Sequence, residues 1–295
     1  MPNRFHIERS ALLLAACSLL GCGGHGGRLD EARELALAGH YRAALLETRT
    51  LLFALPESRG DEATEKTRRG ALKLAGDLCA VHLDDARCAA EEYRQLVKQF
   101  PTAPESLEAR ERLGDLYSRL DDPRDALEAW RDQVATAPDR AGADEVELKI
   151  ARALVDQGRL EEARAAAAEL ASRWPASPLV PRALLLSAST FHLEGRSLDA
   201  IAAYAKVAAA YPRTDVEAEA QFERGNCLTE LGEDARAVQA FTAALVRHES
   251  PELVQFAMQR AQRRLDLVRS VKPGNVAEVF DRGLARVQRR SSASE

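Results

Sequence analysis

The hydrophobic pattern of this chain repeats every 37 residues. An alanine recurs at that interval, and in most repeats the residue four positions later is bulky. The alanines are Ala89, Ala126, Ala163, Ala200 and Ala237, and the bulky residues are Tyr93, Trp130, Tyr204 and Phe241. Residues four apart lie one turn on along the same helical face, so each repeat predicts a helix carrying a small residue beside a large one. A fixed period of this length indicates a repeat fold, in which each unit buries its apolar face against its neighbours.

Three further series keep the same register. A small residue at Gly76, Gly114, Ala151, Ala188 and Gly225 lets a second helix approach closely. Asp121, Gly158, Gly195 and Gly232 fall where a turn needs left-handed backbone. Pro101, Pro138, Pro175 and Pro212 end the second helix, because proline lacks an N–H and clashes with the preceding turn. Each repeat is therefore predicted to be two helices joined by a short turn.

The spacing is longer near the N-terminus. Ala44 and Ala89 are 45 residues apart, which is eight more than the period. We expect the excess in the polar stretch Glu57–Thr67 and in one extra turn residue near Asp84-Asp85. Asp84-Asp85 and Asp121-Asp122 are interpreted as turn residues, since Asp caps the following helix or tolerates left-handed backbone.

One repeat carries the residues of a known family. The L-G-x₂-Y…A-x₃-F…P pattern of tetratricopeptide repeats is reproduced by Leu113-Gly114, Tyr117, Ala126, Trp130 and Pro138. Residues 28–251 resemble about six such repeats. The resemblance implies an all-α fold, a right-handed superhelical solenoid of helix–turn–helix units. Residues 252–290 are predicted to form a pair of capping helices, because a solenoid end needs a polar outer face, and residues 291–295 a disordered tail.

The N-terminus has the layout of a secretory signal peptide. Arg4 and Arg9 precede a short apolar run from Ala11 to Leu20, so residues 1–21 are predicted to be removed. Leu19-Leu20-Gly21-Cys22 resembles the lipobox of bacterial lipoproteins, which implies acylation of Cys22. The run ending at Cys17 is an alternative lipobox, and a plain cleaved signal is a third interpretation.

The segment after this cysteine bears on location. Residues 22–27 are glycine-rich and are predicted to form a flexible tether. In the resembled lipoproteins, a residue other than Asp after the cysteine goes with transfer to the outer membrane, and Gly23 stands here. We therefore expect an outer-membrane lipoprotein that faces the periplasm.

Charge and motifs exclude several function classes. The net charge is −5 with both signs mixed along the chain, whereas nucleic-acid binding needs a concentrated basic surface. The chain has no metal-binding His/Cys cluster, no nucleophile elbow and no phosphate-binding loop. We expect no enzyme activity, no cofactor, no metal, no nucleic acid and no small-molecule substrate.

Three cysteines remain after Cys22. Cys79 lies on the first helix of its repeat and Cys88 on the second, so the two side chains could face each other. In an oxidising periplasm such a pair would form a disulfide, and the alternative is two small buried residues. Cys227 has no evident partner in the sequence.

The resemblance also implies a binding groove, which in this family is lined by the first helix of each repeat. The groove positions by register are Glu108, Glu111, Asp115, Arg119, Arg152, Asp156, Arg182, Ser189, His192, Phe222, Asn226 and Glu230. This mixed polar surface suits an extended peptide or a helix of another protein.

The junction Phe100-Pro101-Thr102-Ala103-Pro104 and its counterparts resemble those of bacterial envelope repeat proteins. Two such families are the lipoprotein of the outer-membrane β-barrel assembly machine and the repeat protein associated with the Tol–Pal system. The expected function is a membrane-anchored adaptor in an envelope machine such as outer-membrane protein assembly. The alternatives are a coordinator of cell-wall synthesis or envelope constriction, a pilot lipoprotein for a secretion or pilus pore, and a self-associating structural protein.

Overall fold

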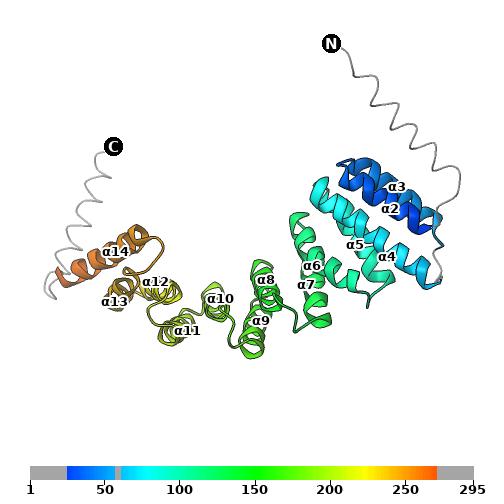
Figure 1. The fold of residues 1–295 in the computed structure, drawn as a ribbon. Coiled ribbons are helices and arrows are strands. Elements are labelled where there is room, and N and C mark those ends of the chain that lie inside the picture. The colour runs from blue at the N-terminus through cyan, green and yellow to red at the C-terminus, as the bar shows by residue number, and fades with distance from the viewer. Residues whose placement is uncertain (1–24, 57–60, 271–295) are drawn as a thin grey trace, which may run out of the picture. The chain divides into compact units, whose positions relative to one another are not determined.

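The computed structural model of the protein describes residues 25–56 and 61–270, and within these ranges the chain is helical (Figure 1). The α-helices are α2 (His25–Leu37), α3 (Tyr41–Ala54), α4 (Glu62–Asp77), α5 (Ala86–Gln99), α6 (Pro104–Arg119), α7 (Pro123–Thr136), α8 (Ala143–Asp156), α9 (Leu160–Arg173), α10 (Val180–Leu193), α11 (Ser197–Ala210), α12 (Asp215–Glu230), α13 (Asp234–Ala244) and α14 (Pro251–Ser270). No strand occurs in the described ranges. The predicted all-α class is confirmed.

The helices follow one another as helix–turn–helix pairs. Helices α2 to α13 make six consecutive pairs, which are the six units predicted from the period, and α14 follows the last pair. The residues group into two compact units, divided between Val146 and Glu147 within α8. The right-handed superhelix stays a prediction.

The turns between paired helices have the backbone that the sequence predicts. Gly195, between α10 and α11, has φ of 74°, in the left-handed region that favours glycine. Asp84 and Asp121 take the same region, with φ of 51° and 57°. The next residue caps the following helix: the carboxylates of Asp85 and Asp122 accept backbone N–H bonds of 3.0 and 3.2 Å. Each acidic pair therefore combines a left-handed turn with an N-cap.

In the second, third and sixth pairs, the bulky residue of the second helix packs on the small residue of the first. A Cβ added at Gly114 would overlap the indole of Trp130, and one added at Gly225 would lie 2.5 Å from Cε1 of Phe241. Gly76 stands against Tyr93 in the same way. The small-residue series is thus required by direct contact with an aromatic ring.

The extra residue of the second repeat lies in a place that the period did not predict. A π-helical turn, Leu78–His82, extends α4 and accommodates one more residue per turn than an α-helix would. The expected position near Asp84-Asp85 was therefore wrong by a few residues, because those two residues make the ordinary turn. Asp61 caps α4 through the Thr64 N–H, so the second half of the polar stretch Glu57–Thr67 is helical.

A disulfide joins this π-helical turn to α5. It links Cys79 to Cys88, whose Cα atoms are 5.7 Å apart. Cys79 is fully buried beside Leu72 and Tyr93 in the core of the first unit. The bond therefore fastens the irregular end of α4 to the helix on which it packs.

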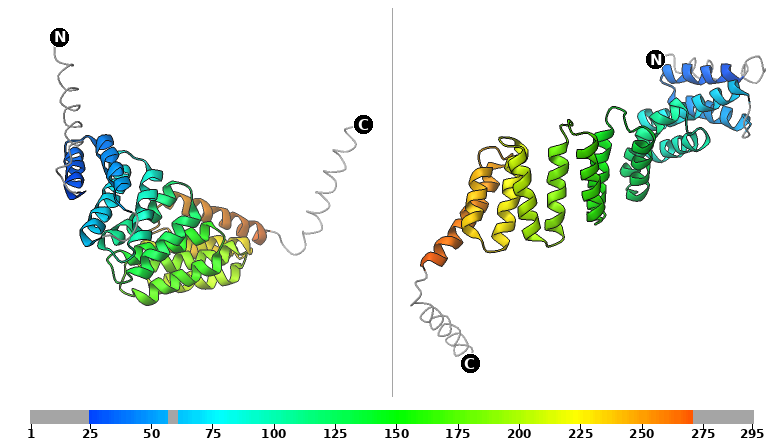
Figure 2. Two further views of the ribbon diagram at one scale, coloured as in Figure 1. Left: turned by 90° about the vertical axis from the view of Figure 1, so that its right-hand side faces the viewer. Right: turned by 90° about the horizontal axis from the view of Figure 1, so that it is seen from below.

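In the second unit, helices α9 to α14 pack each against the next, as the right-hand view of Figure 2 shows. Its largest buried cluster runs from α10 to α14 and is centred on Tyr204, Phe222 and Phe241. Val254 and Ala261 of α14 are fully buried on this cluster. Helix α14 therefore covers the end of the last repeat, as the first of the predicted capping helices, whereas the predicted helix at 275–290 lies outside the described residues.

The predicted tether is corrected at its C-terminal half. Helix α2 begins at His25, so His25, Gly26 and Gly27 are helical rather than part of a flexible segment. Leu29 and Ala32 are buried one turn further on, and their packing extends the helix backwards through these exposed residues. The predicted signal peptide, Cys17 and Cys22 lie outside the described residues. Among the helices described, none is long and apolar enough to cross a membrane.

Replacing Gly114 with alanine should destabilise the protein, because the new Cβ overlaps Trp130 in a packed core. We expect a loss of about 1–3 kcal/mol in the free energy of unfolding, measured by urea denaturation. Gly26→Ala is the matched control, since a Cβ there meets no atom within 4 Å, and it should leave stability unchanged or raise it by up to about 1 kcal/mol. Equal stability of the two variants would contradict the packing argument.

Thiol titration of the denatured, unreduced chain from His25 onward should find one free thiol, that of Cys227. After reduction the count should rise to three, because Cys79 and Cys88 are then released. Three thiols before reduction would show that the bond does not form in the protein.

Candidate functional site

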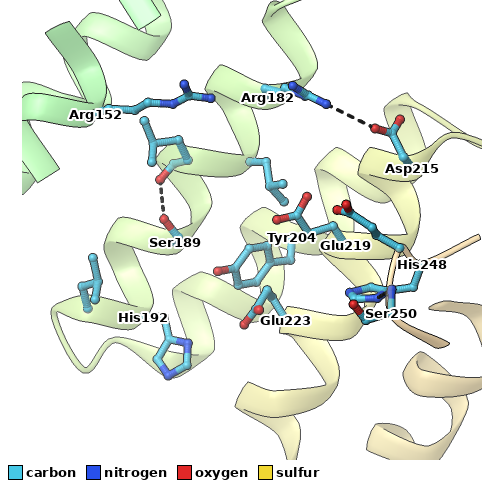
Figure 3. Close-up of a pocket in the computed structure, with 14 residues that line it drawn as sticks. Arg152, Arg182, Ser189, His192, Tyr204, Asp215, Glu219, Glu223, His248 and Ser250 are labelled. Carbon is cyan, nitrogen blue, oxygen red and sulfur yellow. Dashed lines mark hydrogen bonds and ion pairs between the residues drawn. The ribbon is translucent and has the colours of Figure 1, made fainter. Parts of the chain in front are cut away.

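The second unit contains a cavity of about 680 Å³ on the face formed by the first helix of each helix pair (Figure 3). Helices α8, α10, α11 and α12 contribute to its wall, together with the segment that follows α13. The lining residues are Arg152, Arg182, Leu185, Leu186, Ser189, His192, Leu193, Tyr204, Asp215, Glu219, Glu223, His248, Glu249 and Ser250. This surface is called the unit-2 groove below.

One side of the unit-2 groove is basic. Figure 3 shows Arg152 of α8 and Arg182 of α10 on this side, with Arg182 directed at Asp215. The Arg182 guanidinium lies 3.6 Å from the Asp215 carboxylate, and both side chains are largely exposed. Arg152 is exposed and forms no ion pair within the described residues. This side can therefore bind an anionic or hydrogen-bond-accepting group.

The other side is acidic. Glu219 and Glu223 are one turn apart on α12, and Glu249 lies in the segment after α13. Burial raises the pKa of the Glu219 carboxyl, and the negative charge of Glu223 raises that pKa further. The Glu223 carboxylate accepts a 3.3 Å hydrogen bond from the Asn226 amide, which adds no positive charge. Like charges placed this closely favour a cation between them.

Two histidines line the groove and are held by different partners. His192 Nε2 lies 3.1 Å from a Glu230 carboxylate oxygen, and its Nδ1 lies 3.4 Å from Cys227 Sγ. Burial, together with the negative charges of Glu230 and Glu223, raises the pKa of the Cys227 thiol to about 12. Cys227 is therefore a protonated thiol at neutral pH and not an activated nucleophile.

His248 has a structural role at the edge of the groove. Its Nδ1 accepts a 3.0 Å hydrogen bond from the backbone N–H of Ser250, and its ring packs on Phe222 with centroids 4.8 Å apart. In the part of the chain that the structure describes, no group of three or more His, Cys, Asp or Glu side chains is arranged to hold a metal ion.

Of the eight groove residues expected in this unit, four line the cavity: Arg152, Arg182, Ser189 and His192. Asp156, Asn226 and Glu230 lie outside its wall, although Asn226 and Glu230 contact residues that line it. The expectation for Phe222 was wrong. Its side chain is only 8% exposed and packs against Phe241 in the core, because Gly225 lets the two helices approach there.

The four groove residues expected in the first unit are held by neighbours. Glu108 forms a 3.0 Å ion pair with Lys73, and Arg119 forms a 2.6 Å ion pair with Asp84. Glu111 pairs with Arg140. Asp115 accepts a 3.1 Å hydrogen bond from the Trp130 indole N–H. Glu108, Glu111 and Arg119 are thus paired with residues outside their own helix pair, and Asp115 with the aromatic residue inside it, so the second unit is the better candidate site.

Sequence reasoning missed part of the groove. Glu219 stands 37 residues after Arg182 and 111 after Glu108, so the period itself points to this position. Tyr204 was assigned to packing alone. Asp215, His248, Glu249 and Ser250 lie at helix starts and junctions, where the 37-residue register carries no information about side-chain direction.

Comparisons with known proteins agree with this fold. The tetratricopeptide repeat family matches residues 148–215 and 199–252. No curated protein sequence matches the chain. RapI in its apo form has a TM-score of 0.55 at 14% identity, covering 88% of this chain and 75% of RapI.

The C-terminal part of a TPR repeat-containing protein from Cytophaga hutchinsonii has a TM-score of 0.54 at 12% identity, with 85% and 94% covered. MamA is 21% identical over 58% of this chain and 93% of its own, with a TM-score of 0.46. Residues 148–252 of this chain thus match the tetratricopeptide repeat model, and the helical-repeat fold is shared with RapI and the Cytophaga hutchinsonii protein.

Proposed function

We propose that this protein is a membrane-anchored scaffold of the bacterial cell envelope, which binds a segment of another protein in the unit-2 groove and catalyses no reaction. The observation that carries the proposal is the groove itself. Side chains of both charges from four helices and the segment after α13 line an open cavity of about 680 Å³. A surface of this kind suits an extended peptide or a helix, for which charged groups at fixed positions set the register.

The chemistry of the groove favours binding over catalysis. Its nearest candidate nucleophile is Cys227, whose raised pKa leaves the thiol protonated and whose side chain is fully buried. The Ser189 hydroxyl donates a 2.8 Å hydrogen bond to the Leu186 carbonyl and, among the described residues, forms no hydrogen bond with a histidine or a carboxylate. A general base must lie within hydrogen-bond reach of the nucleophile that it activates.

The anchor is inferred from the sequence, and the position of α2 bears on its consequences. His25, the first residue of α2, is three residues after Cys22. Three residues span at most about 10 Å, so an acyl group on Cys22 would hold the first repeat close to the membrane surface. Multiple acyl chains on one residue make such an anchor stable, whereas a single chain is marginal.

For the cellular setting, we propose the periplasmic side of the outer membrane and a role in an envelope machine such as outer-membrane protein assembly. Support comes from the lipobox-like Leu19–Cys22, from Gly23 after it, and from the proline-rich junctions between repeats. A disulfide between Cys79 and Cys88 fits an oxidising compartment.

Replacing Cys22 with alanine should abolish acylation and release the protein from membranes. The measurement is metabolic labelling with an alkyne fatty acid, followed by separation of membrane and soluble fractions. Cys17→Ala is the control and should keep both the label and the membrane fraction. Loss of label in Cys17→Ala with retention in Cys22→Ala would show that Cys17 is the acylated residue. A wild-type protein without label would show that the protein carries no acyl anchor.

Replacing both Arg152 and Arg182 with alanine should weaken partner binding at least about fivefold, because arginines at the centre of an interface carry much of its energy. The measurement is quantitative mass spectrometry of proteins that copurify with the full-length chain from detergent-solubilised envelopes. Arg173→Ala is the matched control, since Arg173 is exposed on α9 and outside the groove. If both variants retain partners as the wild type does, the groove is not the binding site.

A further inference from the structure

In the first unit, the aromatic residues of the second and third repeats have a polar partner at the same position of the repeat. The Tyr93 hydroxyl donates a 2.6 Å hydrogen bond to the Asp77 carboxylate. The Trp130 indole N–H donates a 3.1 Å hydrogen bond to Asp115. Asp77 and Asp115 each follow the small residue on which the aromatic ring packs, Gly76 and Gly114. The repeat thus satisfies the polar tip of its buried aromatic residue internally.

The fifth repeat lacks this partner. Tyr204 is its aromatic residue, and the position after the small residue Ala188 is Ser189. The short Ser189 side chain turns away and donates its 2.8 Å hydrogen bond to the Leu186 carbonyl. Tyr204 is only 1% exposed and lines the unit-2 groove, and its hydroxyl has no hydrogen-bond partner among the described residues. The hydroxyl at the tip of this otherwise buried side chain is therefore available to form a hydrogen bond with a group bound in the groove.

The charged side chains around Tyr204 indicate the charge of a group that could bind there. Burial raises the pKa of the Tyr204 hydroxyl, and the carboxylates of Glu223 and Glu219 raise it further, so the hydroxyl stays neutral beside two acids. Within the described residues, Glu219 forms no ion pair, and Glu223 has only the Asn226 amide. The charges of His248 and Arg182 lower the pKa of Glu219 in part, but the ion pair of Arg182 is with Asp215 (Figure 3). The space beside Tyr204 therefore contains two carboxylates, neither of which forms an ion pair within the described residues.

We propose that this space binds a lysine or arginine side chain of the partner segment, with its cation between Glu219 and Glu223 and a hydrogen bond donated to the Tyr204 hydroxyl oxygen. The inference rests on the proposed function, because it names the side chain that the unit-2 groove selects. Carboxylates and a phenol oxygen are the acceptors that an ammonium or guanidinium group requires. The stem of the basic side chain would lie along Leu185 and Leu186, which also line the groove.

The test uses full-length protein in detergent and three short peptides, acetyl-Ala-Ala-X-Ala-Ala-amide with X as lysine, norleucine or glutamate. Ligand-observed NMR measures saturation transfer and the dissociation constant of each peptide. We expect the lysine peptide to bind at least about tenfold more tightly than the other two, because only it places a charged donor between the carboxylates.

Two groove variants and one control locate the binding. Tyr204→Phe should weaken lysine-peptide binding about threefold to tenfold, and it should fold normally because Phe241 fills the same position in the next repeat. Glu219→Gln with Glu223→Gln should remove the preference for lysine. Glu161→Gln with Glu169→Gln removes two exposed carboxylates of α9 and should leave binding unchanged.

The inference is overturned if the norleucine or glutamate peptide binds as tightly as the lysine peptide, if no peptide binds, or if the groove variants behave like the α9 control. Failure of the proposed function has a different signature. In that case the lysine peptide binds, but no envelope protein copurifies through the groove.

Discussion

The contact between the aromatic ring of the second helix and the small residue of the first fixes the geometry of these repeats. At Gly76, Gly114 and Gly225 the ring stands so close that no Cβ could fit. This contact sets the distance between paired helices, and the distance in turn sets which side chains lie on the exposed face of the first helix. The left-handed turn reverses the chain between the paired helices, and the closing proline ends the second helix, so that the next repeat begins in the same register 37 residues later. The groove exists because this geometry recurs.

Variation at one position beside that contact distinguishes the repeats from one another. Asp77 and Asp115 accept a hydrogen bond from the polar tip of an aromatic residue. In the sixth repeat this position is Asn226, and the aromatic residue, Phe241, has no polar tip. In the fourth repeat Arg152 occupies this position and the aromatic residue is replaced by Ala167, so the arginine has no aromatic tip to satisfy. In the fifth, Ser189 leaves the Tyr204 hydroxyl without its partner. The two departures occur in adjacent repeats, and both Arg152 and Ser189 line the unit-2 groove.

The sequence predicted the features that repeat. The six helix pairs, the left-handed turns at Asp121 and Gly158 and the close approach at Gly114 all follow from residues that recur in register. Features that occur only once in the chain were harder to predict from the sequence. The π-helical turn at Leu78–His82 accommodates an inserted residue. The length of the insertion follows from the spacing of the repeats, but its position does not. Phe222 was expected on the groove because register gives a residue's angular position, whereas its burial depends on Phe241 and His248 packing over it. Glu219 could have been found by extending the register one repeat further.

The central claim is that the unit-2 groove holds a segment of another envelope protein, and site-specific photocrosslinking in living cells tests it most directly. Leu193 lines the groove and is 62% exposed, so a benzoylphenylalanine placed there faces any bound segment. Leu198 of α11 is 70% exposed and outside the groove, which makes it the matched control. The account predicts a discrete crosslinked envelope protein from position 193 that position 198 does not give. The same products from both positions, or none from position 193, would contradict it.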